Sequence, residues 1–298
     1  IDSDLRGTAF GGGIAVAGNR LFATSGTGQV VALNAADGSV IWSASPAGPL
    51  RDSPTLAFNL VLVMTQDNRI IALNQNDGEI AWQESGSLAQ AGVFGVASPA
   101  AGQGTVVAGY SSGELVAYRY ENGRVLWADA LARTSISTEV GSISDIDADP
   151  IIDNGRVYAL GQGGRMAAYE LVTGQRIWEL NLSGISTPAL AGEWLFTLTS
   201  DARLLAIARS SGKVRWITQL ARYRDEKDRK GPIFWTGPVL ASNMLYIANS
   251  RGELWQASVG EGSASMMTEL PDSVSLPPIV ANETLYVLDD GGTITALR

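Results

Sequence analysis

An eleven-residue pattern that ends in tryptophan recurs along this chain and constrains its fold more than any other feature. Residues 32–42 have the sequence ALNAADGSVIW, and residues 72–82 repeat it as ALNQNDGEIAW. Three further copies end at Trp127, Trp178 and Trp216, each with glycine four residues and alanine ten residues before the tryptophan. Self-similarity of this kind indicates a fold built from repeated supersecondary units.

The length of the repeat predicts the four-stranded blades of a β-propeller. Successive tryptophans of the pattern are 40, 45, 51 and 38 residues apart, and periods of about 40–50 residues are typical of propeller blades. In the second repeat, apolar runs at 59–65 and 69–74 predict two buried strands, and 79–82 predicts an outer strand. The Asn-Asp-Gly turn at 76–78 supplies the positive φ that a tight hairpin needs.

The expected fold is an all-β propeller of four-stranded antiparallel blades with seven visible repeats, forming one domain over residues 1–298. The blades are expected at about 5–45, 50–86, 93–131, 146–182, 185–220, 233–268 and 275–298. The sixth repeat keeps Gly262 but has Met266 in place of tryptophan, and the seventh stops at Arg298 before its outer strand. Either the last blade has three strands or the chain lacks N-terminal residues, and we prefer the second interpretation.

The recurring tryptophans are predicted to be structural. An indole on an outer strand can cover the neighbouring blade, bury about 150–250 Å² and donate its N–H to a backbone carbonyl. The small alanine and glycine of the pattern would allow the close approach. The expected docking residues are Trp42, Trp82, Trp127, Trp178 and Trp216.

Composition excludes several classes of function. The 298 residues include no histidine and no cysteine, which excludes Ser-His-Asp and Cys-His nucleophiles and zinc sites made of thiolates and imidazoles. The net charge of −9 argues against nucleic acid or an anionic membrane as a partner, because phosphate binding needs clustered lysine and arginine. The acidic start Ile1-Asp2-Ser3-Asp4 has no signal peptide, which indicates a processed or trimmed beginning.

Two glycine-rich motifs match catalytic signatures but are predicted to be turns. Residues 109–113 satisfy the G-x-S-x-G pattern of a nucleophile elbow, and residues 161–164 resemble a phosphate-binding loop. Each lies between two predicted strands with no helix after it, and the chain has no histidine to activate Ser111. Both motifs are therefore expected to be hairpin turns.

An acidic segment follows the third copy of the pattern. Asp145, Asp147 and Asp149 alternate as in the start of a calcium loop, but Pro150 and Arg156 occupy the positions where such a loop needs glycine and glutamate. Residues 133–149 are predicted to form an extended inter-blade loop, and such insertions collect on binding faces. Two interpretations remain open, namely a solvated acidic loop that docks a basic partner and a plain solvated loop.

A second charged segment, residues 222–230, has five positive and three negative side chains. The pattern favours a solvated, mobile loop. The alternative is a secondary contact surface.

The repeat resembles the tryptophan-docking repeat of the pyrroloquinoline-quinone (PQQ) propeller superfamily. Within that superfamily, residues 137–152, STEVGSISDIDADPII, resemble the BamB family of outer-membrane lipoproteins of the β-barrel assembly machinery. The resemblance covers essentially the whole chain. It implies an eight-bladed ring of which one N-terminal repeat is absent here, and a non-enzymatic scaffold without a cofactor or metal.

The resemblance also implies a partner, a periplasmic POTRA domain of the barrel-forming subunit BamA, bound by two neighbouring inter-blade loops. One loop carries paired aspartates, which match Asp145 and Asp147. The other usually reads Leu-x-Leu-Arg-Gly and is AGVFG at 91–95 here, so that Val93 and Gly95 correspond while Phe94 replaces the arginine. Phe94 removes a charge-assisted contact, although an exposed phenylalanine could anchor an interface by burial.

Location and further partners follow from the same resemblance. The protein is expected at the periplasmic face of the outer membrane, held there by a lipid-bearing cysteine that is not in this chain. Unfolded outer-membrane proteins are a further expected partner. Nucleic acid is not expected.

The alternative function is a quinone-dependent dehydrogenase of the same superfamily, or another ligand-binding propeller, because a fold does not fix a function. The dehydrogenases use a catalytic aspartate, a calcium ion held by glutamate and asparagine, and often a vicinal cysteine pair. This chain has no cysteine, and no calcium-binding constellation stands out. The scaffold interpretation is preferred.

Overall fold

The computed structural model describes residues 12–46, 48–50, 52–87, 97–131 and 145–298. In these ranges the regular secondary structure is all β, and no helix is long and apolar enough to cross a membrane. The chain divides into two compact units, residues 1–177 and 178–298. The division falls within strand β16 (Arg176–Leu180).

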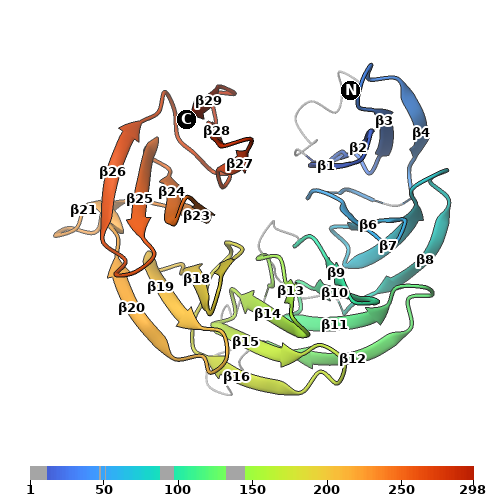
Figure 1. Cartoon of the computed structure of the whole chain (residues 1–298), viewed down its shortest axis with the longest axis horizontal. Coiled ribbons are helices and arrows are strands. Elements are labelled where there is room, and N and C mark those ends of the chain that lie inside the picture. Colours follow the sequence, from blue (N-terminus) through green and yellow to red (C-terminus); the bar gives the residue numbers. More distant parts are fainter. Residues whose placement is uncertain (1–11, 47, 51, 88–96, 132–144) are drawn as a thin grey trace. The chain divides into compact units, whose positions relative to one another are not determined.

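The first unit contains three four-stranded antiparallel sheets and three strands of a fourth, which β16 completes. Within each sheet the strands follow one another in chain order (Figure 1). The strands are β1 (Ile14–Ala17), β2 (Arg20–Thr24), β3 (Val30–Asn34), β4 (Val40–Ala44), β5 (Thr55–Ala57), β6 (Leu60–Met64), β7 (Arg69–Asn74), β8 (Ile80–Ser85), β9 (Ala100–Gly102), β10 (Thr105–Gly109), β11 (Glu114–Arg119), β12 (Val125–Ala130), β13 (Ile151–Asp153), β14 (Arg156–Gly161) and β15 (Arg165–Glu170).

The second unit contains two four-stranded sheets, a three-stranded sheet and a separate two-stranded hairpin, β21–β22. Its strands are β17 (Ala189–Ala191), β18 (Trp194–Leu198), β19 (Arg203–Ala208), β20 (Val214–Gln219), β21 (Tyr223–Asp225), β22 (Lys230–Pro232), β23 (Trp235–Ala241), β24 (Met244–Asn249), β25 (Glu253–Ser258), β26 (Ala264–Glu269), β27 (Ile279–Ala281), β28 (Thr284–Leu288) and β29 (Ile294–Leu297). Seven successive meander sheets are the blades of a β-propeller, which confirms the predicted fold class.

The alanine and tryptophan of the repeat face each other across two strands. Ala72 on β7 pairs with Trp82 on β8, and Ala117 on β11 pairs with Trp127 on β12. The register shifts by one residue directly after each alanine, as in a β-bulge. This pairing explains the ten-residue spacing, because the small alanine leaves room for the indole beside it. In the sixth sheet the tryptophan is on the third strand, at the position of the alanine, and Trp255 pairs with Met266 on the fourth strand.

The indoles connect consecutive sheets. The Trp82 Nε1–H donates to the Tyr120 carbonyl (2.7 Å), and the Trp127 Nε1–H donates to the Leu171 carbonyl (2.7 Å). Equivalent bonds join Trp42 to Gln75, Trp178 to Arg209 and Trp216 to Val259. Each indole also covers the turn glycine of the following sheet, at Gly78, Gly123, Gly174, Gly212 and Gly262, where an added Cβ would lie within 2.4–2.9 Å of the ring.

Burial differs between the strands of a sheet in the way that this stacking requires. All residues of β6 and β10 are buried, whereas β8 and β12 bury Trp82 and Trp127 and leave most of their other residues exposed. The middle strands are therefore covered on both faces, as expected when blades pack face to face. Within the first unit, β1, β5, β9 and β13 lie next to one another in that order.

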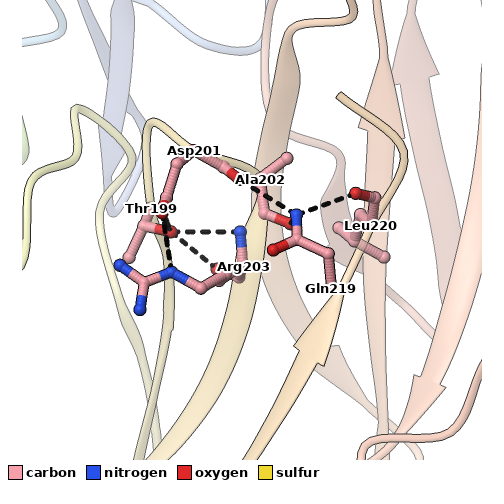
Figure 2. A network of polar contacts seen from close by, with 6 residues as sticks. All are labelled: Thr199, Asp201, Ala202, Arg203, Gln219 and Leu220. Carbon is pink, nitrogen blue, oxygen red and sulfur yellow. Dashed lines mark hydrogen bonds and ion pairs between the residues drawn. The ribbon is translucent and has the colours of Figure 1, made fainter. Parts of the chain in front are cut away.

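The turns between the second and third strands are built from side chains. In Figure 2, the Thr199 hydroxyl lies within hydrogen-bond distance of the Asp201 carboxylate and accepts the N–H of Arg203 (3.0 Å), and Arg203 Nε donates to Asp201 (3.0 Å). The second sheet repeats the arrangement with Thr65, Asp67 and Arg69. The two catalytic-like motifs occupy the same kind of turn, between β10 and β11 and between β14 and β15, as predicted.

The charged segment 222–230 differs from its prediction. It is exposed as expected, but it forms the β21–β22 hairpin, in which Tyr223 pairs with Pro232 and Asp225 with Lys230. The sequence did not indicate this hairpin, because alternating charges carry no apolar signal for a strand.

Candidate partner-docking surface

The acidic segment before β13 is held between turns of the third and fourth sheets. The Ile146 N–H donates to the Tyr110 carbonyl (3.2 Å), and the Gln162 N–H donates to the Asp145 carbonyl (2.8 Å). Tyr110 belongs to the β10–β11 turn and Gln162 to the β14–β15 turn. The two bonds fix the backbone of this segment at the point where two blades meet.

One glycine makes room for the segment. Ile146 is buried, and a Cβ at Gly109 would lie 2.4 Å from its Cγ2. At Gly161 a Cβ would make only ordinary contacts, 3.5 Å from the Asp145 carbonyl oxygen and 3.7 Å from Ile146 Cγ1. The first glycine of the G-x-S-x-G motif therefore accommodates the Ile146 side chain, a role in packing that needs no nucleophile.

A carboxylate network holds the other end of the segment. The Ser98 N–H donates to Asp149 Oδ1 (2.7 Å) and also to Asp52 Oδ2 (3.1 Å). The Ser98 hydroxyl donates to the Ser53 carbonyl (2.9 Å), and the Thr24 hydroxyl donates to the Asp52 carbonyl (2.6 Å). These contacts connect the residues that precede β5, β9 and β13, so the first four sheets position the acidic segment together.

Asp145 and Asp147 lie on either side of Ile146 and differ in exposure. Asp145 is completely buried and Asp147 is half-buried. Burial and the neighbouring Asp145 charge raise the pKa of Asp147 from 3.8 to about 7. Within the described residues, Oδ2 of Asp147 accepts no hydrogen bond. The expectation of a solvated loop was wrong for Asp145. The neighbouring apolar residues Ile146 and Ala148 are buried between the blades, and Asp145 is buried with them.

A cationic side chain is the chemical group that this arrangement would bind. An ammonium or guanidinium near Asp147 would favour the ionised carboxylate and lower its pKa. The negative charge of Asp145 adds to the same local potential. Among the residues that the structure describes, no three acidic side chains lie close enough together to hold a metal ion.

Only part of the predicted site can be placed. The structure brings Asp145 and Asp147 together on one segment, whereas Val93, Phe94 and Gly95 lie outside the described residues, as do 132–144 of the long inter-blade stretch. Sequence reasoning missed the positioning roles of Asp52, Ser98 and Asp149. A signal was present, because a polar residue followed by proline recurs before four first strands, at 53–54, 98–99, 149–150 and 187–188.

Comparisons with known proteins point to one family. The model of the family described as outer membrane protein assembly factor BamB matches residues 2–218. The outer membrane protein assembly factor BamB of Salmonella typhimurium is 29% identical over 287 residues, which cover 96% of this chain and 71% of the relative.

Solved structures are similar in fold. The crystal structure of BamB from Moraxella catarrhalis has a TM-score of 0.84 at 21% identity, covering 96% of this chain and 84% of that chain. Quinohemoprotein alcohol dehydrogenase from Comamonas testosteroni has a TM-score of 0.62 at 12% identity, covering 93% of this chain and 70% of that chain. Both similarities show the β-propeller fold alone. Because the family model matches most of its length, this chain belongs to the family of outer membrane protein assembly factors BamB.

Proposed function

We propose that this chain is a non-enzymatic accessory factor in the assembly of outer-membrane proteins and that it docks a periplasmic POTRA domain of BamA. The acidic segment 145–149 is one half of the docking surface, and the loop with Val93 is the other. Its place of action is the periplasmic face of the outer membrane, with lipid anchoring in the full-length protein. Family membership supports this function.

The observation that carries the docking assignment is the placement of Asp147. Its carboxyl group lies on a backbone that is fixed at both ends, and its buried Oδ2 has no donor within the described residues. A preorganised group costs little entropy on binding. A basic side chain of the partner that approached the half-buried Asp147 would favour its ionised form and compensate the charge of Asp145.

Retention by an immobilised POTRA array of BamA tests the proposal. The wild-type chain should be retained, and Asp145→Lys with Asp147→Lys should abolish retention because the local potential at the docking segment changes from negative to positive. Asp147→Asn removes the charge with little change in shape and should weaken binding about tenfold, or about 1.4 kcal/mol. Retention by the wild type should also fall from pH 8 to pH 6, because Asp147 takes up a proton near pH 7.

A matched control separates the segment from a general charge effect. Glu79→Lys with Glu261→Lys makes the same change in net charge at two exposed turns and should leave retention unchanged. Thermal unfolding followed by circular dichroism shows whether each variant is folded. If folded Asp147→Asn and the double-lysine variant are retained like the wild type, the docking assignment is wrong.

A further inference from the structure

The β21–β22 hairpin is a basic element on an acidic protein. Residues 222–230 carry a net charge of +2 from five cations and three anions, and since the whole chain carries −9, the remaining residues carry −11. All five cations are exposed. In Figure 1 the hairpin lies at the left margin of the view, beyond the sheets of the second unit.

The acidic side chains of the hairpin are engaged within it. Glu226 Oε1 accepts the backbone N–H groups of Arg222 (2.6 Å) and Tyr223 (3.2 Å). Asp225 Oδ1 accepts the N–H of Asp228 (3.0 Å), and the Asp228 carboxylate lies 3.6 Å from the Lys230 ammonium. The three carboxylates therefore shape the hairpin.

The other cations of the hairpin differ from Lys230 in their contacts. In the part of the chain that the structure describes, Arg224, Lys227 and Arg229 form no ion pair, and the guanidinium of Arg222 lies 5.7 Å from the ring centre of Tyr223. The stem of Arg224 packs beside Gly231, where a Cβ would lie 3.1 Å from Arg224 Cδ. Glycine at this position leaves space for the stem of Arg224, whose side chain is exposed.

The base of the hairpin is fixed to the second unit. The Gln219 carboxamide donates to the carbonyls of Asp201 (3.0 Å), Ala202 (3.1 Å) and Leu220 (2.9 Å), as Figure 2 shows. On the other side, the Ile233 N–H donates to the Arg222 carbonyl (2.8 Å), and the Trp235 Nε1–H donates to the Ala221 carbonyl (2.7 Å). The cations therefore project from an anchored element.

An exposed aromatic side chain lies close to the hairpin in sequence. Phe234 comes two residues after strand β22, is 69% exposed, and has its backbone fixed by two bonds with Ser250. Arginine and exposed aromatic residues are the side chains that protein interfaces favour. The segment 222–234 therefore offers both exposed cations and an exposed apolar side chain.

We propose that this hairpin, with Phe234, docks an acidic segment of a partner protein. Guanidinium groups bind carboxylates through paired donors. An extended anionic surface, such as a bilayer or a nucleic acid, would also lie near the rest of the chain. Its net charge of −11 would repel that surface. A local acidic segment avoids that repulsion, because charges beyond about 8 Å are largely screened at physiological salt.

A labelled peptide tests this surface directly. Fluorescence anisotropy would follow binding of a fluorescein-labelled, glutamate-rich peptide with one leucine to the whole chain. The wild type should bind it, and R224E with K227E and R229E should bind about tenfold more weakly or worse, as expected when three attractive contacts become repulsive. Phe234→Ser should weaken binding by about threefold through loss of apolar burial. Circular dichroism should show equal thermal unfolding for all variants.

A control triple variant has the same net charge. Arg124→Glu, Lys213→Glu and Arg298→Glu reverse three exposed cations elsewhere and should leave peptide affinity within about twofold of the wild type, because distant surface charges are screened. Equal weakening in both triple variants, or absence of binding by the wild type, would overturn the proposal. Pelleting with phosphatidylglycerol vesicles that depends on the hairpin cations, without peptide binding, would assign the surface to a lipid instead. The POTRA retention experiment is independent of these outcomes.

Discussion

At the scale of single residues, burial decides how Asp147 responds to pH. Its carboxyl is half-buried beside Asp145, and both effects raise its pKa to about 7. The folded chain therefore holds this proton more tightly than the unfolded chain. By linkage, the contribution of Asp147 to stability is complete below the unfolded pKa near 3.8 and is lost as the pH rises through about 7.

Asp147→Asn should therefore stabilise the isolated protein at pH 8 and have little effect at pH 4. The asparagine resembles the protonated acid and does not ionise, so it avoids the cost of a buried charge. The gain at pH 8 is expected to be about 1–3 kcal/mol, after allowance for partial exposure. Thermal unfolding across this pH range measures it.

Asp37→Asn is the matched control for this pH dependence. The side-chain and backbone hydrogen bonds from Ser39 lower the pKa of Asp37, so its contribution is present at neutral pH and lost as the pH falls through the folded value. Asp37→Asn should consequently bring no gain at pH 8. A gain for Asp147→Asn that is the same at pH 4 and pH 8 would contradict the assigned burial.

The sequence pattern identified the acidic segment but did not predict that part of it is buried. The alternation of Asp145, Asp147 and Asp149 indicates charge on one side of an extended segment. Ile146 packs where Gly109 leaves space for it, and Gly109 ends a strand that is distant in sequence. No local pattern contains that information, so the burial of Asp145 could not be predicted.

At the scale of elements, the tryptophan and the turn glycine form a joint between consecutive blades. Trp42 covers Gly78, where an added Cβ would lie 2.6 Å from ring atom Cε3. Gly38 occupies the same kind of Asp-Gly turn with nearly the same φ, +73° against +75°, but a Cβ there would meet nothing within 4 Å. The two glycines therefore share a backbone conformation, but only Gly78 lies against an indole ring.

Gly78→Ala should destabilise the protein more than Gly38→Ala. Both variants place a Cβ at positive φ and incur a similar strain of about 1 kcal/mol. Only Gly78→Ala also displaces an indole, which should add about 1–3 kcal/mol. Urea denaturation midpoints, compared at equal slope, measure the difference. Equal destabilisation by the two substitutions would show that the indole contact contributes nothing.

Sequence patterns predicted the blade strands well and the hairpin poorly. The runs 59–65 and 69–74 are apolar throughout because β6 and β7 are covered on both faces. The hairpin strands Tyr223–Asp225 and Lys230–Pro232 are exposed. Their sequences therefore lack the apolar alternation that predicts a strand. Their pairing depends on Glu226 and Asp225 accepting backbone N–H groups, which composition alone does not indicate.

At the scale of the whole molecule, the repeat specifies fold and composition restricts chemistry. The tryptophan spacing predicted a β-propeller with seven visible repeats, and the described residues form seven meander sheets, of which the seventh has three strands. The expectations of one domain and of a further N-terminal repeat stay predictions. Similarity to a quinohemoprotein dehydrogenase is a similarity of fold, and the chain has neither histidine nor cysteine.

Titration with pyrroloquinoline quinone and calcium should give no saturable change in the absorbance of the quinone. The quinone carries carboxylates, and a chain of net charge −9 repels them unless cations or a bound metal compensate. A quinone dehydrogenase of the same superfamily serves as the positive control. Saturable binding to this chain would contradict the scaffold function and favour the dehydrogenase alternative.

The joint between blades also bears on how such a chain can change during evolution. The second to fifth repeats each present a tryptophan to the repeat after and a turn glycine to the repeat before, as Trp82 and Gly78 do on the second sheet. A tandem duplication of one repeat therefore creates a new boundary that already has both complementary parts. Repeat number can grow by gene duplication without compensating substitutions, while the loops between repeats diverge independently.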